Sequence, residues 1–131
     1  MIIDFHTHTF PEKIAAITLE KLSRAGQVPP CTNGTAEGLL SSMRTAGIDL
    51  SVILPVATRP DQVPGINNSA AALNEQFGKQ GLVSFGCIHP DCADWYGELC
   101  RVAELGLKGI KIHPVYQQTD QDDLRYLRIL E

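Results

Sequence analysis

The chain has 131 residues, enough for one domain with a sizeable core, and 44% of them are hydrophobic while 20% are charged. The net charge of −4 is spread over interspersed acidic and basic residues, which gives no electrostatic reason to expect a nucleic acid or an anionic membrane as partner. Without a recognisable signal peptide or a long apolar run, we expect one cytoplasmic domain over residues 1–131.

The first predicted element is a strand at residues 2–9, Ile-Ile-Asp-Phe-His-Thr-His-Thr. Alternate side chains of a strand project from one face, so Asp4, His6 and His8 are expected on the same side. Two imidazoles one strand repeat apart can bind a single metal ion, and Asp4 can orient a ligating ring from beneath. The alternative is that His6 and His8 are ordinary polar residues where a strand runs into a loop.

Two helices are predicted next. The first begins at Pro11 and ends at Gly26, and an irregular loop then covers Gln27–Gly34. Thr35 can cap the second helix, which ends before Gly47.

Residues 48–56 are too apolar for a solvent-facing strand and are typical of a strand covered on both faces, as in parallel sheets. A loop then leads to a helix capped by Asn67 or Asn68 and ending near Gln80. A third strand is expected over Leu82–His89.

The last elements are a helix that ends at Gly106, a strand over Gly109–His113 and a final helix capped by Asp120 or Asp122. That final helix is expected to contain Leu124, Leu127 and either Ile129 or Leu130.

The chain contains an internal similarity. Ala46-Gly47-Ile48 with Pro55-Val56 matches Leu105-Gly106-Leu107 with Pro114-Val115, and in both copies the glycine precedes the proline by eight residues. Repeated strand–helix units with continuous apolar strands indicate a parallel sheet. Four units are visible where a closed (β/α)₈ barrel needs eight, so we expect an α/β half-barrel. The alternative is a four-stranded doubly wound sheet, although no glycine-rich phosphate loop follows the first strand.

All four histidines lie at predicted strand ends: His6 and His8, His89, and His113. Active sites of parallel barrels are found at these carboxyl ends. Lys111 shares the alternation of His113, and both are candidates for catalysis. The alternatives are that Lys111 pairs with an interior carboxylate such as Asp4, that His113 only ends its strand, and that His89 is structural.

Three segments carry a resemblance to a known family: Ile3-Asp4-Phe5-His6-Thr7-His8 followed by Phe10-Pro11-Glu12, then Phe85-Gly86-Cys87-Ile88-His89-Pro90, and then Glu104 through Pro114 with Lys111-Ile112-His113-Pro114. In register over the whole chain, they resemble the first, third and fourth barrel strands of the amidohydrolase superfamily. The nearest likeness is to its amidohydrolase-related branch, which also contains the aminocarboxymuconate-semialdehyde decarboxylases.

The resemblance implies a divalent metal, most often zinc, held in part by His6 and His8, and a hydrolysis at a C–N or C–O bond of a small molecule. Decarboxylation is the alternative within the same branch. The family's other metal ligands and its main base would lie beyond Glu131, so the site is expected to be incomplete in residues 1–131.

Two further alternatives remain. A metal phosphoesterase of the polymerase-and-histidinol-phosphatase type also opens with His-x-His-Thr, but there a Ser-Asp pair usually stands where this chain has Phe10-Pro11-Glu12. The second alternative is that the chain is a truncated, non-catalytic half-barrel that forms homo-oligomers through exposed sheet edges. The four cysteines have no paired spacing, so we expect free thiols.

Overall fold

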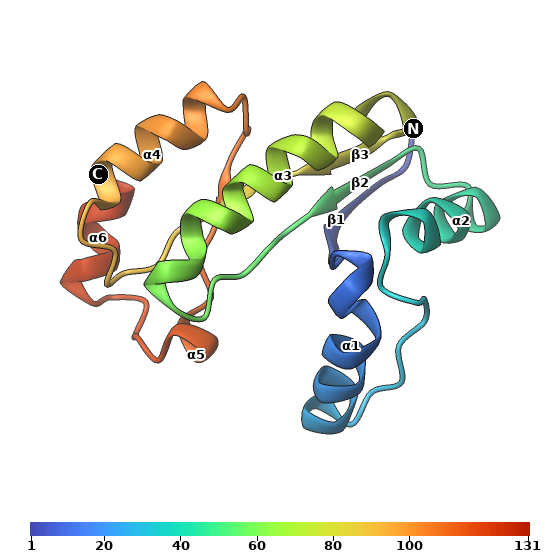
Figure 1. Cartoon of the computed structure of the whole chain (residues 1–131), viewed down its shortest axis with the longest axis horizontal. Helices are drawn as coiled ribbons and strands as arrows, with labels where there is room; N and C mark the ends of the chain where they lie inside the picture. Colours follow the sequence, from blue (N-terminus) through green and yellow to red (C-terminus); the bar gives the residue numbers. More distant parts are fainter. The chain divides into compact units, whose positions relative to one another are not determined.

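The computed structural model describes residues 1–131, apart from the side chains of residues 25 and 26, and it is a mixed α/β structure with parallel strands (Figure 1). The chain divides into two compact units. The first comprises Met1–Ile53 and Phe77–Val83, and the second comprises Leu54–Gln76 and Ser84–Glu131. None of the described helices has both the length and the apolar character needed to cross a bilayer.

The first unit is built on a three-stranded sheet in which β2 lies between β1 and β3. Its elements are β1 (Ile3–Thr7), α1 (Glu12–Gly26), α2 (Ala36–Ala46), β2 (Leu50–Ile53) and β3 (Leu82–Ser84). β1 and β2 run parallel, with Ile3 opposite Leu50 and Thr7 opposite Ile53. The last three residues of β2 are buried, which confirms the prediction of a strand covered on both faces.

The ends of α2 agree with the prediction from sequence. The Thr35 hydroxyl accepts a hydrogen bond from the Gly38 amide at 3.0 Å, and Gly47 ends the helix with a φ of 69°. Such a cap satisfies one of the amides that the first turn of a helix leaves unpaired. α1 follows Pro11 and ends at Gly26, as expected, and Gln27 after it has a φ of 52°.

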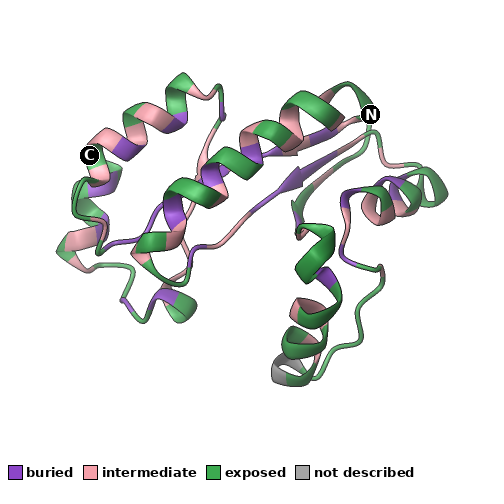
Figure 2. Cartoon of the chain, viewed as in Figure 1, coloured by how far each residue is buried: buried purple, intermediate pink, exposed green. Residues whose placement is uncertain are grey.

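The second unit contains a two-stranded parallel sheet and four helices. These elements are α3 (Val63–Phe77), β4 (Gly86–Cys87), α4 (Trp95–Glu104), β5 (Ile110–Lys111), α5 (Pro114–Gln117) and α6 (Leu124–Leu130). Their core is formed by buried side chains from strand ends and helices, coloured purple in Figure 2: Ala57, Val63, Cys87, Ile88, Tyr126 and Ile129.

The prediction that Asn67 or Asn68 caps the third helix is wrong. A 3₁₀ turn over Pro60–Gln62 leads directly into α3, which begins at Val63. The Gln62 side chain accepts hydrogen bonds from the two backbone amides just before this turn, at 2.9 and 3.2 Å. The helix therefore starts without the Ser, Thr, Asp or Asn that a sequence pattern identifies as a cap.

Asn67 and Asn74, two turns apart on α3, instead bind the backbone of the segment predicted as the third strand, at Cys87 on β4 and at Ser84 on β3. The Asn67 amide accepts from the Cys87 N–H at 2.8 Å and donates to the Cys87 carbonyl at 3.1 Å. Asn74 makes the same pair of bonds with Ser84. In the structure the predicted single strand Leu82–His89 is two strands, β3 and β4, which pair in different sheets.

The final helix also differs from its prediction. Asp123, not Asp120 or Asp122, caps α6, and its carboxylate accepts from the Arg125 amide at 2.8 Å. This start turns Tyr126 inward.

With that helical phase, Tyr126 and Ile129 are buried, while Leu124, Leu127 and Leu130 are exposed. The physical reason is the Tyr126 hydroxyl, which donates to the buried side chain of Gln117 and thereby fixes the rotation of α6.

Candidate functional site

His6 and His8 lie at the carboxyl end of β1 in the first unit. Their rings are in edge-to-face contact, with centroids 5.1 Å apart and planes at 67°. If two imidazoles bind one ion through bonds of about 2 Å at a roughly tetrahedral angle, their centroids are about 5 Å apart. The observed spacing of the two rings therefore fits two ligands of a single metal ion.

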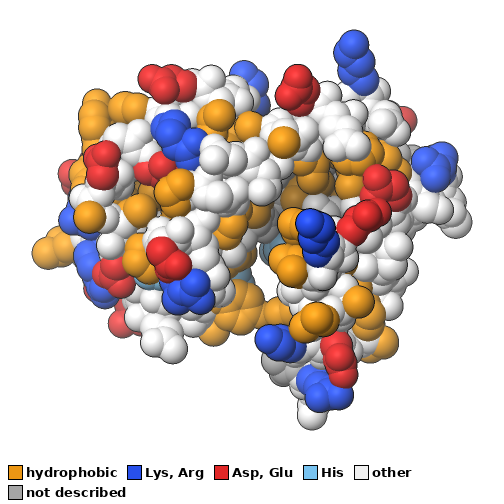
Figure 3. Space-filling model, in the orientation of Figure 1, with side chains coloured by type: hydrophobic (Ala, Val, Ile, Leu, Met, Phe, Trp, Pro, Cys, Tyr) orange, Lys and Arg blue, Asp and Glu red, His pale blue; other side chains and the backbone are white. Residues whose placement is uncertain are grey.

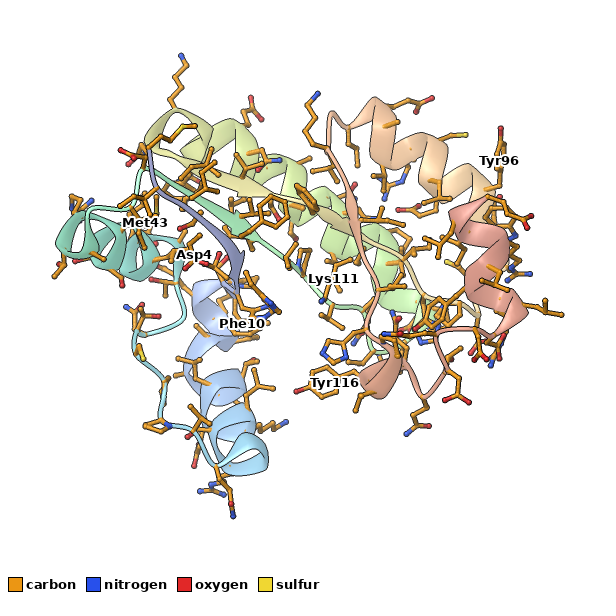
Figure 4. All side chains as sticks on the ribbon, turned by 180° about the vertical axis from the view of Figure 1, so that it is seen from behind. Asp4, Phe10, Met43, Tyr96, Lys111 and Tyr116 are labelled. Atoms are coloured by element: carbon orange, nitrogen blue, oxygen red, sulfur yellow. The ribbon has the colours of Figure 1, made fainter. Side chains whose placement is uncertain are left out.

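Asp4 acts on the backbone of this pair. Its carboxylate accepts a hydrogen bond from the His6 amide at 3.1 Å (Figure 4 labels Asp4). Between Asp4 and Thr7 the register with β2 is irregular, because β1 has one residue more than its partner. The regular alternation expected from sequence is thus interrupted by a bulge, although the two imidazoles still lie side by side.

The donor set of this pair is small. Among the residues that the structure describes, no group of three or more His, Cys, Asp or Glu side chains is arranged to hold a metal ion. Catalytic zinc sites usually have three protein ligands. The pair fits part of such a site, and metal binding by it stays a prediction.

Lys111 and His113 belong to the second unit. Lys111 is half-buried on β5 opposite Cys87, and Figure 4 shows it on the strand that leads to Tyr116 on α5. His113 directly precedes α5: its ring stacks on Tyr116 with centroids 4.2 Å apart, and its Nδ1 accepts from the Tyr116 amide at 3.4 Å. The ring of His113 is therefore held in one orientation at the strand end.

His89 follows β4, and its buried ring is held within the fold. Its Nδ1 accepts a hydrogen bond from the Asp91 amide at 3.2 Å. Burial lowers the pKa of His89 below its usual value, although the Asp91 carboxylate opposes this shift. These contacts favour the structural interpretation of His89.

A hollow of about 340 Å³ opens at the carboxyl ends of the strands in the second unit. It is lined by residues that follow β2, β4 and β5: Thr58–Asp61, His89, Asp91 and Tyr116–Gln118. Two arginines neutralise its carboxylates, because Arg59 binds Asp61 through two hydrogen bonds of 3.0 Å and Arg125 binds Asp91 at 2.7 Å. Ligands of parallel sheets typically bind at such strand ends.

Gln117, at the floor of this hollow, is a residue that sequence reasoning missed. Its buried amide donates to the carbonyls of Ala57 at 2.9 Å and Ile88 at 2.8 Å, and it accepts from the His113 amide at 3.0 Å and from the Tyr126 hydroxyl. A glutamine amide has two donors and a carbonyl oxygen with two acceptor positions, and all are used here. Gln117 therefore fixes the segments after three strands relative to one another.

No family model, curated protein or solved structure matches this chain. The likeness to the amidohydrolase-related branch rests on the sequence segments given above.

Cys87 and Glu98 are two further titratable side chains of the second unit. Burial raises the pKa of the Cys87 thiol to about 12, so it is neutral and unreactive at physiological pH. Burial alone would raise the pKa of Glu98, but hydrogen bonds from Arg101 and Asn67 lower it below its usual value. Glu98 is therefore an ionised anchor that joins α3 and α4 rather than a proton donor.

Proposed function

We propose that this chain is the amino-terminal half of a metal-dependent hydrolase of the amidohydrolase-related type, which uses a metal-activated water on a C–N or C–O bond of a small molecule. The observation that carries the proposal is the His6–His8 pair, whose 5.1 Å spacing at the end of a parallel strand matches two ligands of one ion. When bound, zinc would polarise the carbonyl of the substrate and lower the pKa of a water molecule.

The residues of the chain have separate parts in this proposal. His6 and His8 hold the metal, and Asp4 fixes the backbone between them through the His6 amide. Lys111 and His113 are the candidates for contact with substrate, because the strand end and the stacked Tyr116 ring give His113 a defined orientation. The main base and the remaining ligands are expected outside residues 1–131.

The fold is consistent with this role. Parallel pairs join β1 to β2 and β4 to β5, and helices follow the strands in the order that a (β/α) repeat requires. We infer four units of an eight-unit barrel from this order, with the histidines at the carboxyl ends of the strands.

The first test is zinc titration by calorimetry at pH 7.5, with the 131-residue chain. We expect one ion per chain with micromolar or weaker affinity, lost in both His6→Ala and His8→Ala, because two imidazoles leave the other zinc positions to water. His113→Ala is the matched control and should keep the binding. Zinc binding that is retained in both His6→Ala and His8→Ala would contradict the proposal.

The second test is turnover of ester, lactone and amide panels with zinc present. We expect none from the 131-residue chain and activity from a parent that carries the second half, since the described residues include no group of three or more metal-binding side chains that would complete the site around the two histidines. Tight one-to-one zinc binding by the 131-residue chain, together with turnover that His8→Ala abolishes, would contradict the expectation that its metal site is incomplete.

A further inference from the structure

The loop that joins α1 to α2 in the first unit contains Asn33-Gly34, the single Asn-Gly pair of the sequence. Asparagine is among the thermally labile residues of proteins, because the backbone nitrogen of the next residue can attack its side-chain carbonyl carbon and close a five-membered ring. A following glycine favours this attack, since it has no Cβ to crowd the nitrogen. Asn33 is exposed, so solvent reaches its side chain.

Two hydrogen bonds polarise the carbonyl that would be attacked. The Asn33 Oδ1 accepts from the Thr35 amide at 3.1 Å and from the Thr35 hydroxyl at 2.9 Å. Attack on the carbonyl carbon moves negative charge onto this oxygen, and donors that already point at the oxygen stabilise that charge. The Thr35 hydroxyl is held in turn by the Gly38 amide, which donates to it at 3.0 Å. The two donors of Thr35 are therefore placed as an oxyanion hole requires.

The attacking nitrogen belongs to Gly34, which is held on both sides of its backbone. Its N–H donates to the Thr32 hydroxyl at 3.1 Å, and its carbonyl accepts from the Phe10 amide at 2.8 Å. A hollow of about 630 Å³ borders Asn33 and admits water to the loop. Figure 3 shows atoms that are neither hydrophobic nor charged, in white, on the outside of the molecule in the region of α2. Nucleophile, polarised carbonyl and water are thus brought together.

We propose that Asn33-Gly34 is a self-modifying site, at which Asn33 loses its side-chain amide nitrogen in the folded chain. The Gly34 nitrogen forms a bond to the Asn33 Cγ, the bond from Cγ to Nδ2 breaks, and the proton of the Gly34 nitrogen passes through water to the leaving nitrogen, which departs as ammonia. Water then opens the succinimide ring at either carbonyl and leaves aspartate or isoaspartate at position 33. The steps consume one water molecule and need no oxidant or cofactor.

The two products differ in their effect on the first unit. Aspartate keeps an oxygen in the place to which Thr35 donates. Isoaspartate adds a methylene to the backbone directly before Gly34, which lies so close to α1 that a Cβ on it would be 2.9 Å from the Leu19 Cδ1. The added atom also displaces the Gly34 carbonyl from the Phe10 amide, so isoaspartate should loosen the loop from α1. This proposal goes beyond the proposed function and does not depend on metal binding.

The test is peptide mapping by mass spectrometry after incubation of the 131-residue chain at pH 8 and 37 °C, folded and in concentrated urea. Loss of the amide nitrogen adds about 1 Da to the peptide that contains Asn33. We expect Asn33 to react at least as fast in the folded chain as in urea, because the fold supplies both donors. Asn68 is the internal control: it is exposed, but its neighbour Ser69 lies within α3, so it should react at least about tenfold more slowly than Asn33 in the folded chain.

Substitutions of Thr35 separate polarisation of the carbonyl from simple loosening of the loop. Thr35→Val removes the hydroxyl donor and should slow the reaction of Asn33 at least about fivefold, whereas Thr35→Ser keeps the hydroxyl and should retain the rate. A loosened loop alone would not slow the reaction. A slower reaction of Asn33 in the folded chain than in urea, or equal rates in the two Thr35 variants, would overturn the proposal. The comparison with urea decides it even if circular dichroism shows that Thr35→Val does not fold.

Discussion

Replacement of Gln117 tests how the segments that follow the strands are held together. Gln117→Ala leaves four groups without their partner, namely two carbonyls, one amide and the Tyr126 hydroxyl. Each buried polar group that loses its partner costs about 1–3 kcal/mol, but the adjacent hollow lets water bind some of them. We therefore expect a loss of about 3–5 kcal/mol in the free energy of unfolding.

That loss is large but should leave most of the chain folded, because native proteins typically have about 5–15 kcal/mol of stability. Gln117→Glu should cost at least as much, since it turns a donor into an oxygen that faces the carbonyls of Ala57 and Ile88. Tyr126→Phe removes only one of the four bonds and should cost about 1 kcal/mol.

Urea unfolding followed by tryptophan fluorescence measures these losses, because Trp95 is the single tryptophan and packs against the core of the second unit. Gln118→Ala is the matched control: the side chain is exposed, and a change within about 0.5 kcal/mol is expected. A loss below about 1 kcal/mol for Gln117→Ala, similar to that of the control, would refute the assignment of Gln117 as the group that joins these segments.

Three further outcomes are expected. His89 has a lowered pKa in the folded chain, so the unfolded chain binds the proton more readily. The free energy of unfolding should stay constant above about pH 6.5 and fall below it, more steeply in the parent than in His89→Gln. Equal slopes of the free energy of unfolding against pH in the two chains would contradict this. Thiol-reagent kinetics at pH 8 should show rapid modification of exposed Cys31 and none of Cys87 until the chain unfolds, so equal rates would disprove the protection of Cys87. Gly81→Ala should lower stability by about 2 kcal/mol or more, because φ is 94° and an added Cβ would meet the Asp49 carbonyl oxygen; an unchanged urea midpoint would refute this strain.

The sequence alone determined the features that depend on neighbours along the chain. Helix α2 follows from the Thr35 cap and from Gly47, because a capping hydroxyl and a positive φ act within one turn. The apolar run of β2 and the side-by-side rings of His6 and His8 are likewise local, as residues two apart in a strand are neighbours.

The tertiary structure decided the features in which a polar side chain pairs with a distant backbone. The sequence pattern predicts Asn67 as a helix cap, but its side-chain amide binds Cys87, twenty residues away. Gln117 has no distinguishing pattern in the sequence, although its side-chain amide binds the carbonyl of Ala57, sixty residues away. An amide side chain in sequence does not specify its partner, since the partner is set by which strands meet. The rotation of α6, and with it the exposure of Leu124 rather than Tyr126, depends on one such bond, because a buried hydroxyl without a partner costs more free energy than an exposed leucine.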